Sequence, residues 1–151
     1  MNNNNNNINI NICKLNEGAK IPEYKSEGAS GLDLCSCENY IIEPGKIKLI
    51  STGLKLEIPS GYEAQIRSRS GLALNFGVFC LNSPGTIDAD YRGEIKIILC
   101  NLGENDFKIN AGDRVAQIIF SKVERVNLNL IPENELSKTK RDFNGFGSTG
   151  I

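Results

Sequence analysis

The glycine-rich end of the sequence is the stretch best suited to bind phosphate. Residues 144–151 contain three glycines, two hydroxyl side chains and one aromatic ring, that of Phe146. Backbone of this kind cradles phosphate, because close approach and left-handed dihedral angles direct several N–H groups at one anion. We therefore predict an arm that closes over a phosphorylated ligand, with Phe146 stacked on a flat group. The alternative is a disordered polar tail.

A second candidate anion site is the run Arg-Ser-Arg-Ser-Gly at residues 67–71, which we expect to end a strand and begin a short helix. The N-terminus of a helix presents unpaired N–H groups and the positive end of the helix dipole. Two arginines and a serine hydroxyl would strengthen such a site. The commoner alternative is a solvated basic turn.

Carboxylates follow a predicted hairpin turn at residues 82–85. Pro84 and Gly85 match the second and third positions of a type II turn, and Asp88 and Asp90 are expected to share one face of the extended chain behind it. Because the sequence contains no histidine, the general base of an enzyme must be a carboxylate, Lys, Tyr or thiolate. Asp88 is such a candidate, although a turn carboxylate is more often structural.

Two further polar residues lie in apolar surroundings. Gln117 is flanked by apolar residues, and a buried amide must hydrogen-bond within the protein or to a ligand. An internal partner is the commoner outcome. Asp33 lies in the run Gly-Leu-Asp-Leu at residues 31–34, where its carboxylate can organise a turn.

Short alternating runs predict an all-β domain to position these side chains. Apolar and polar residues alternate, as in strands with one buried face, in the segments 54–58 and 62–67 and at residues 94–97, after which the run is apolar through Cys100. Residues 115–120 are predicted to form another strand, after a turn at residues 111–113. Turn signals recur about every 8–12 residues, the spacing of a sandwich or barrel. One short helix is predicted at residues 72–76, with Ser70 as its N-cap and Gly77 as its left-handed end.

The composition narrows the function classes. A length of 151 residues fits one domain. A formal charge of -1 does not favour nucleic acid or an anionic membrane as a partner, and no apolar run has the length of a transmembrane helix. Five cysteines, an odd number, and no recognisable leader favour reduced thiols in an intracellular protein, cytoplasmic or nuclear. Without histidine we expect buried strand cysteines rather than a zinc site at Cys35 and Cys37.

We divide the chain into three parts. Residues 1–12 form an asparagine tract with interleaved isoleucines, which we predict to be disordered. Residues 13–131 form the β domain, and residues 132–151 form a flexible arm. Twenty residues can extend roughly 65 Å, far enough to reach another subunit. Since a detached arm needs another surface to order it, we expect an oligomer.

Five segments, in order, resemble the five motifs of the trimeric deoxyuridine triphosphatases (dUTPases): residues 28–34, 69–73, 82–94, 112–117 and 145–150. The resemblance runs from about Cys13 to the end of the chain. It implies a jelly-roll-like or distorted β-barrel domain and a homotrimer whose active sites are each built from three subunits. It also implies hydrolysis of dUTP to dUMP and pyrophosphate, with Mg²⁺ chelated by the triphosphate. This reaction keeps uracil out of DNA and supplies dUMP for thymidylate synthesis.

The resemblance also assigns roles to residues. Asp88 corresponds to the catalytic aspartate that orients and deprotonates the attacking water. Asp33 corresponds to a position that touches the metal only through water, so no direct protein ligand is expected. Tyr91 corresponds to the residue that packs on the deoxyribose. The other implied substrate contacts are Arg69, Ser70, Gly71, Asn82, Gly85, Thr86, Ile87, Lys96, Gln117, Arg141, Phe146, Gly147, Ser148 and Thr149.

Two other functions remain open on the sequence. A dCTP deaminase of the same superfamily shares the β scaffold but usually lacks the glycine-rich arm, and it would release ammonia. A catalytically silent nucleotide-binding regulator would bind a ligand without forming pyrophosphate. The arm differs from the family's usual pattern, because Asp142, Phe143 and Asn144 stand where small glycines normally follow the arginine.

Overall fold

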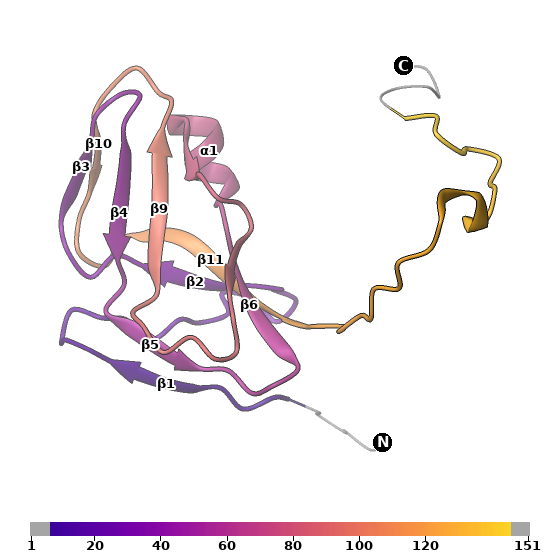
Figure 1. Ribbon diagram of the computed structural model, residues 1–151. Helices are drawn as coiled ribbons and strands as arrows, with labels where there is room; N and C mark the ends of the chain where they lie inside the picture. The colour runs from indigo at the N-terminus through magenta and orange to yellow at the C-terminus, as the bar shows by residue number, and fades with distance from the viewer. Residues whose placement is uncertain (1–6, 146–151) are drawn as a thin grey trace.

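The computed structural model of the protein describes residues 7–145. Within them lie eleven strands, one α-helix and one short 3-10 helix (Figure 1). Helix α1 (Ser70–Phe76) lies between β6 and β7, and helix η1 (Glu133–Glu135) follows β11. The strands are β1 (Asn11–Lys14), β2 (Leu32–Cys35), β3 (Tyr40–Ile42), β4 (Ile47–Ser51), β5 (Leu54–Glu57), β6 (Tyr62–Arg67), β7 (Val78–Cys80), β8 (Gly85–Ile87), β9 (Lys96–Asn101), β10 (Phe107–Ile109) and β11 (Arg114–Lys122).

A four-stranded sheet carries many of the residues predicted to be functional. Its strand order is β2-β11-β6-β8, and all neighbours are antiparallel. In this sheet Gln117 lies opposite Asp33 on one side and opposite Arg67 on the other. Directly opposite residues of antiparallel strands point to the same face. The side chains of these three residues therefore share one face of the sheet.

The remaining strands form three smaller sheets, ordered β4-β9-β7, β1-β5 and β10-β3. Together with the four-stranded sheet they surround one apolar core, and Figure 1 shows the sheets set at steep angles to one another. The prediction of an all-β, jelly-roll-like fold is confirmed. It takes the form of a distorted, open arrangement of sheets within residues 7–145.

The predicted alternation accounts for much of the core. In β5 the side chains of Leu54 and Leu56 are buried, Lys55 is half-buried and Glu57 is exposed. Burying one such apolar side chain contributes about 1.5–3 kcal/mol relative to leaving it in water. The same rule holds in β6, where Ala64 and Ile66 are buried. A two-residue repeat therefore directs one face of each strand inward.

The predicted helix is present, but its first residue was assigned wrongly. Arg69, not Ser70, is the N-cap of α1, and the cap has no side-chain hydrogen bond. Ser70 instead begins the helix. The predicted left-handed end is confirmed, since Gly77 has φ 67°. A Cβ atom at Gly77 would lie 2.7 Å from the backbone nitrogen of Gly103, so both dihedral angle and close packing require glycine there.

The segment 82–91 differs from its prediction in three respects. It is not a hairpin, because β7 pairs with β9 and β8 pairs with β6, so residues 81–84 connect two sheets. Gly85 is the first residue of β8 and has no positive φ, so the turn is not type II; the Ser83–Pro84 peptide bond is cis. Asp88 and Asp90 do not share the face of an extended strand, because β8 ends at Ile87 and a turn follows. Turn type and strand end depend on tertiary pairing that local sequence does not contain.

Part of the asparagine tract is ordered. Strand β1 begins at Asn11 and pairs with β5, so the prediction of disorder is wrong for Asn11 and Ile12. The amide Nδ2 of Asn11 donates to Oε2 of Glu57 at 2.7 Å, and Ile10 packs against the apolar core. The interleaved isoleucines give the tract an apolar face that a strand can bury.

The buried side chain of Asn101 fastens the end of β9 to the loop that follows it. Its Nδ2 donates to the main-chain oxygens of Ile42 at 2.8 Å and Asn105 at 2.9 Å, and its Oδ1 accepts from the N–H of Gly103 at 2.8 Å. The side chain is fully buried. Loss of the amide would leave these backbone groups without their partner.

We predict that Asn101→Ala lowers the free energy of unfolding by about 2–4 kcal/mol, because buried polar groups without partners are costly. Urea unfolding at a fixed protein concentration measures the change. Asn105→Ala is the matched control, because its exposed side chain should matter by less than about 0.5 kcal/mol. Equal losses in the two variants would contradict the assignment.

Candidate active site

A forked ion pair fixes two arginines beside the start of α1. The carboxylate of Asp33 lies 3.5 Å from Nε of Arg69 through Oδ1 and 2.8 Å from Nη1 of Arg114 through Oδ2. Arg69 also donates from Nη1 to the main-chain oxygen of Arg114 at 2.7 Å. Two guanidinium groups against one carboxylate leave net positive charge with a defined direction. That arrangement suits the binding of an anion such as phosphate.

The first residues of α1 lie next to this ion pair. Ser70 and Gly71 are exposed, and a Cβ atom built on Gly71 would meet nothing within 4 Å. The first N–H groups of a helix have no partner inside the helix. The serine hydroxyl and these N–H groups are therefore exposed beside Arg69, and their role as anion contacts stays a prediction.

Gln117 lies on the same sheet face as Asp33, in the register given above. Its side chain is half-buried, and within residues 7–145 the side-chain amide forms no hydrogen bond. The expectation of an internal partner is therefore wrong for this part of the chain. The amide is available to a ligand, and Asp33, Arg69, Ser70, Gly71 and Gln117 together form what we call the phosphate-side group.

A second group of predicted residues lines a hollow of about 540 Å³. Asp88 lies at its edge on the turn after β8, and its side chain is exposed. Among the described residues the carboxylate forms no ion pair or hydrogen bond, so it is free to accept a proton. We call this set the hollow-side group: Leu49, Thr86, Ile87, Asp88, Tyr91, Glu94 and Lys96.

The turn that carries Asp88 is braced by an arginine. The N–H of Tyr91 donates to the main-chain oxygen of Asp88 at 3.1 Å. The Nη1 of Arg92 donates to the main-chain oxygens of Ala89 at 2.6 Å and Tyr91 at 2.9 Å. These bonds give an exposed turn a defined conformation, which a positioned catalytic carboxylate requires.

Glu94 links several residues of the hollow through hydrogen bonds and an ion pair. The carboxylate of Glu94 accepts from the N–H of Gly53 at 2.9 Å through Oε1, and its Oε2 lies 3.4 Å from Nζ of Lys96. The main-chain oxygen of Glu94 accepts from the Tyr91 hydroxyl at 3.1 Å. Lys96 thus lies on the hollow with its ammonium group directed by a carboxylate.

Asn82 and Gly85 approach each other closely in the connection between β7 and β8. A Cβ atom at Gly85 would lie 3.0 Å from Nδ2 of Asn82. The end of β7 is also tied to the basic segment, because Oγ of Ser68 accepts from the N–H of Cys80 at 2.9 Å.

The two groups lie at opposite ends of β6. Ile87 is opposite Ala64 and Gly85 is opposite Ile66, so the turn with Asp88 begins level with the first residues of β6. Arg69 follows the last residue of β6. The four residues of β6 between these two ends span about 13 Å. Two members of the phosphate-side group, Gln117 and Asp33, lie on β11 and β2, on the side of β6 away from β8.

Residues 124–145 lie apart from the rest of the described chain (Figure 1). For residues 124–145, every hydrogen bond described joins two residues of this segment. Nε of Arg141 donates to the main-chain oxygen of Asn144 at 2.9 Å, which closes a turn over Asp142 and Phe143. Four predicted contacts lie outside the described residues: Phe146, Gly147, Ser148 and Thr149.

The cysteines are free thiols rather than an evident metal site. Cys37, Cys80 and Cys100 are buried as predicted, whereas Cys35 is half-buried and Cys13 is exposed on β1. Burial raises the pKa of the Cys80 thiol, and the hydrogen bond with Ser68 opposes that shift. Within residues 7–145 no three His, Cys, Asp or Glu side chains are grouped to hold a metal ion. None of the helices there is long and apolar enough to cross a membrane.

Three residues of the site were not predicted. Arg114 pairs with Asp33, and Leu49 and Glu94 line the hollow beside Asp88. The sequence signal for Arg114 and Glu94 was membership of the motif segments 112–117 and 82–94. Leu49 comes from β4, which the fold brings to the hollow from far along the chain. No local pattern marks it.

Solved structures that share this fold are nucleotide hydrolases. The dUTPase of Staphylococcus bacteriophage 80alpha, solved with dUPNHPP, has a TM-score of 0.87 and 26% identity and covers 95% of this chain and 99% of its own. A variant of the dUTPase from phage phi11 of S. aureus, with a structural Mg(II) ion, has a TM-score of 0.78 and 24% identity over 85% of this chain and 100% of its own. The fold and the site thus define an enzyme of the nucleotide hydrolase class.

Sequence comparison gives the family. A model of the dUTPase family matches residues 17–150. The deoxyuridine 5'-triphosphate nucleotidohydrolase of Chlamydia muridarum is 51% identical over 141 residues, which is 92% of this chain and 97% of that protein. The enzyme of the same name from a Thermoanaerobacter species is 53% identical over 133 residues, 87% of this chain and 88% of that protein. The chain belongs to the dUTPase family.

We predict energetic coupling between Asp33 and Arg114. A double-mutant cycle of Asp33→Asn and Arg114→Gln, measured by urea unfolding, should give a coupling free energy of about 1 kcal/mol, because the carboxylate is mostly buried while the arginine is partly solvated. Lys48→Gln replaces Arg114→Gln as the control, since Lys48 lies on β4. A coupling of zero for the first pair means that the fork is not formed in solution.

Proposed function

We propose that this protein hydrolyses dUTP to dUMP and pyrophosphate. The observation that carries the proposal is Asp88, an exposed carboxylate without a described partner on a braced turn at the edge of a hollow. Membership of the dUTPase family supports the substrate. In a cell this reaction lowers the dUTP available to DNA synthesis and supplies dUMP for thymidylate synthesis.

In the mechanism we propose, Asp88 orients a water molecule and takes a proton from it. The water oxygen attacks the α-phosphorus in line, and the bond from this phosphorus to the oxygen bridging to the β-phosphorus breaks. Pyrophosphate leaves with the electron pair. Carboxylate bases of this kind contribute by position and by available charge, and the absence of histidine leaves a carboxylate as a natural choice.

Arg69, Ser70, Gly71 and Gln117 are proposed to hold the phosphoryl groups. Charge shifts onto the phosphoryl oxygens as the bond breaks, and fixed donors stabilise that charge more in the transition state than before it. The support is geometric, because Asp33 fixes Arg69, and Ser70, Gly71 and Gln117 are accessible. Asp33 thus acts through the direction it gives to an arginine.

Magnesium is proposed to reach the site on the triphosphate. Within the described residues no ligand set for a metal is present, and both carboxylate oxygens of Asp33 contact guanidinium groups. Phosphate oxygens and water are ligands that Mg²⁺ prefers, and the bound ion neutralises phosphoryl charge. A carboxylate oxygen has more than one lone pair, so Asp33 retains capacity for the water-mediated contact.

The segment from Asn82 to Tyr91 is proposed to recognise the base and the sugar. Asn82 and the main chain of Gly85, Thr86 and Ile87 hydrogen-bond to uracil. Cytosine presents the opposite donor and acceptor pattern and would leave buried groups unpaired. Sites of this kind discriminate against the wrong ligand by a factor on the order of 10⁴ or more. Tyr91 packs on deoxyribose, and Lys96 adds a polar contact from the wall of the hollow.

A complete site is proposed to need more than one copy of the chain. Asp88 and Arg69 must reach one triphosphate, yet β6 holds them at opposite ends and on opposite flanks. A homotrimer, in which one copy supplies the hollow-side group and a neighbour supplies the phosphate-side group, brings them together. Closed symmetric oligomers provide such shared sites.

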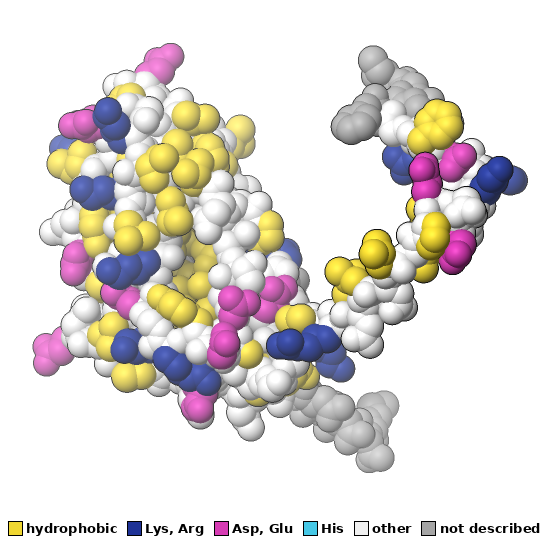
Figure 2. Space-filling model, viewed as in Figure 1, with side chains coloured by type: hydrophobic (Ala, Val, Ile, Leu, Met, Phe, Trp, Pro, Cys, Tyr) yellow, Lys and Arg dark blue, Asp and Glu magenta, His cyan; other side chains and the backbone are white. Residues whose placement is uncertain are grey.

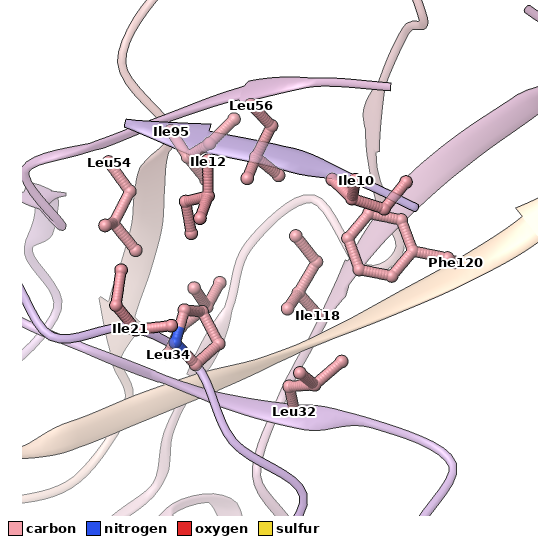
Figure 3. Close-up of a pocket in the computed structure, with 11 residues that line it drawn as sticks. Ile10, Ile12, Ile21, Leu32, Leu34, Leu54, Leu56, Ile95, Ile118 and Phe120 are labelled. Atoms are coloured by element: carbon pink, nitrogen blue, oxygen red, sulfur yellow. The ribbon is translucent and has the colours of Figure 1, made fainter. Parts of the chain in front are cut away.

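The segment that leads into the arm, residues 126–130, supports the same assembly. Val126, Leu128 and Leu130 are 74%, 92% and 102% exposed, and Figure 2 shows hydrophobic side chains along this detached segment. Apolar side chains at every second position need a surface to cover them. A neighbouring copy offers one in an apolar hollow of about 180 Å³ beneath β1, in which Ile10, Ile12, Leu56, Ile118 and Phe120 converge (Figure 3).

In the proposed division of the chain, residues 13–131 form the β domain, and residues 132–151 form the arm that closes a neighbour's site. Arg141, Gly147, Ser148 and Thr149 then contact the phosphates, and Phe146 stacks on uracil. The turn over Asp142 and Phe143 lies directly before these residues, so Asp142 brings a negative charge near the phosphate region.

The experiment that tests the function is a pyrophosphate assay with magnesium across the four common dNTPs, dUTP and UTP, run beside a sizing column. dUTPase activity predicts pyrophosphate from dUTP with strong preference over the others. Ammonia released from dCTP would instead identify the deaminase alternative, and tight dUTP binding without pyrophosphate would identify the silent regulator.

We predict that Asp88→Asn binds a non-hydrolysable dUTP analogue within a few-fold of the unaltered protein but loses at least about 10³-fold in kcat. Calorimetric titration gives the affinity and the pyrophosphate assay gives kcat. Asp90→Asn, two residues away on the same turn, is the matched control and should retain most of the activity. Retained turnover in Asp88→Asn removes the assigned role.

We predict that truncation before Arg141 leaves the oligomer intact and lowers kcat/KM by several decades, because loss of one electrostatic donor alone costs about 10²–10³. Sizing by light scattering and the pyrophosphate assay measure the two effects. A truncated protein that dissociates would show that residues 141–151 hold the subunits together.

A further inference from the structure

The ring of Tyr91 lies directly over Gly93. A Cβ atom built on Gly93 would clash with the hydroxyl oxygen and with Cζ of Tyr91, and it would lie 2.9 Å from Cε2 of the same ring. Real Cβ atoms do not approach other atoms so closely. Only a residue without a side chain allows the ring its present place.

The same ring is fixed at its hydroxyl end. The Tyr91 hydroxyl donates to the main-chain oxygen of Glu94 at 3.1 Å, and the Glu94 carboxylate is itself held by the N–H of Gly53 at 2.9 Å. Tyr91 and Glu94 both line the hollow beside Asp88. The position of the ring in the hollow therefore depends on two neighbours. Residue 93 must lack a side chain, and the main-chain oxygen of Glu94 must be in place to accept the hydrogen bond from the hydroxyl.

Gly93 is not required for its backbone conformation. Its φ lies outside the left-handed region that favours glycine, so alanine can adopt the same backbone. The atoms that an alanine would strike belong to one side chain, which can rotate. Gly93→Ala should therefore displace the Tyr91 ring while the strands around it remain in place.

We propose that Gly93 is a specificity-determining positioning residue, which sets the Tyr91 ring against the sugar and so selects deoxyribose over ribose. This inference rests on the proposed function, in which Tyr91 packs on the deoxyribose. A ring displaced by even a short distance opens room for a 2′-hydroxyl. Selectivity between dUTP and UTP then depends on a residue that touches neither nucleotide.

The test compares kcat/KM for dUTP and UTP in five proteins: the unaltered protein, Gly93→Ala, Tyr91→Ala, the double variant and Gly28→Ala. Gly93→Ala should lower the dUTP:UTP ratio by about 10–100-fold. In the double variant the alanine has no ring to strike, so the ratio should equal that of Tyr91→Ala. Gly28 is the matched control, because it is exposed and a Cβ atom there meets nothing within 4 Å.

An unchanged ratio in Gly93→Ala, or a ratio in the double variant that falls by the product of the two single effects, overturns the proposal. If Gly93→Ala fails to fold, the ring contact predicts that adding Tyr91→Ala restores folding. In that case Tyr91→Phe, which removes only the hydrogen bond from the Tyr91 hydroxyl to Glu94, should lower the dUTP:UTP ratio about two- to tenfold. An unchanged ratio in Tyr91→Phe then overturns it. Failure of the unaltered protein to hydrolyse dUTP is a different result, which overturns the proposed function itself.

Discussion

The pairing of β6 with β8 on one side and with β11 on the other is the constraint on which the site depends. Ile87 lies opposite Ala64, and Gln117 lies opposite both Arg67 and Asp33. A strand cannot shift by one residue without turning its buried face outward, so this register is rigid. It places the Asp88 carboxylate level with one end of β6 and the phosphate-side group at the other end, the separation on which the proposal of a shared site depends.

The proposed assembly of several copies is consistent with this constraint and with other features of the chain. The segment after β11 carries Val126, Leu128 and Leu130 away from the domain with their side chains in solvent, a state that is stable only against another surface. The apolar hollow beneath β1 is a surface of matching chemistry. The two separated groups of residues and the uncovered apolar side chains therefore both support the proposed assembly with a neighbouring copy.

Local pattern was sufficient for β5, β6, β9 and β11 and for the helix, and the order of five motifs was sufficient for the family. Alternation at residues 54–58 reports which face is buried, and Gly77 reports a left-handed helix end, because both signals act within a few residues. The errors at Gly85 and at the first residues of β1 arise because each depends on a strand partner far along the chain. Ser70 is the first helical residue rather than the cap, and the side chain of Gln117 has no partner among the described residues. Leu49 and the close approach of the Tyr91 ring to Gly93 could not be predicted, since side-chain position emerges only once the hollow is formed.

Subunit complementation tests the shared site most directly. Asp88→Asn and Arg69→Gln proteins are each expected to be nearly inactive, and they are mixed, unfolded together and refolded. If the two residues of one site come from different copies, random assembly restores about a quarter of the unaltered activity, because each intact residue reaches half of the sites independently. If both residues come from the same copy, no site regains both, and the mixture stays as inactive as its components.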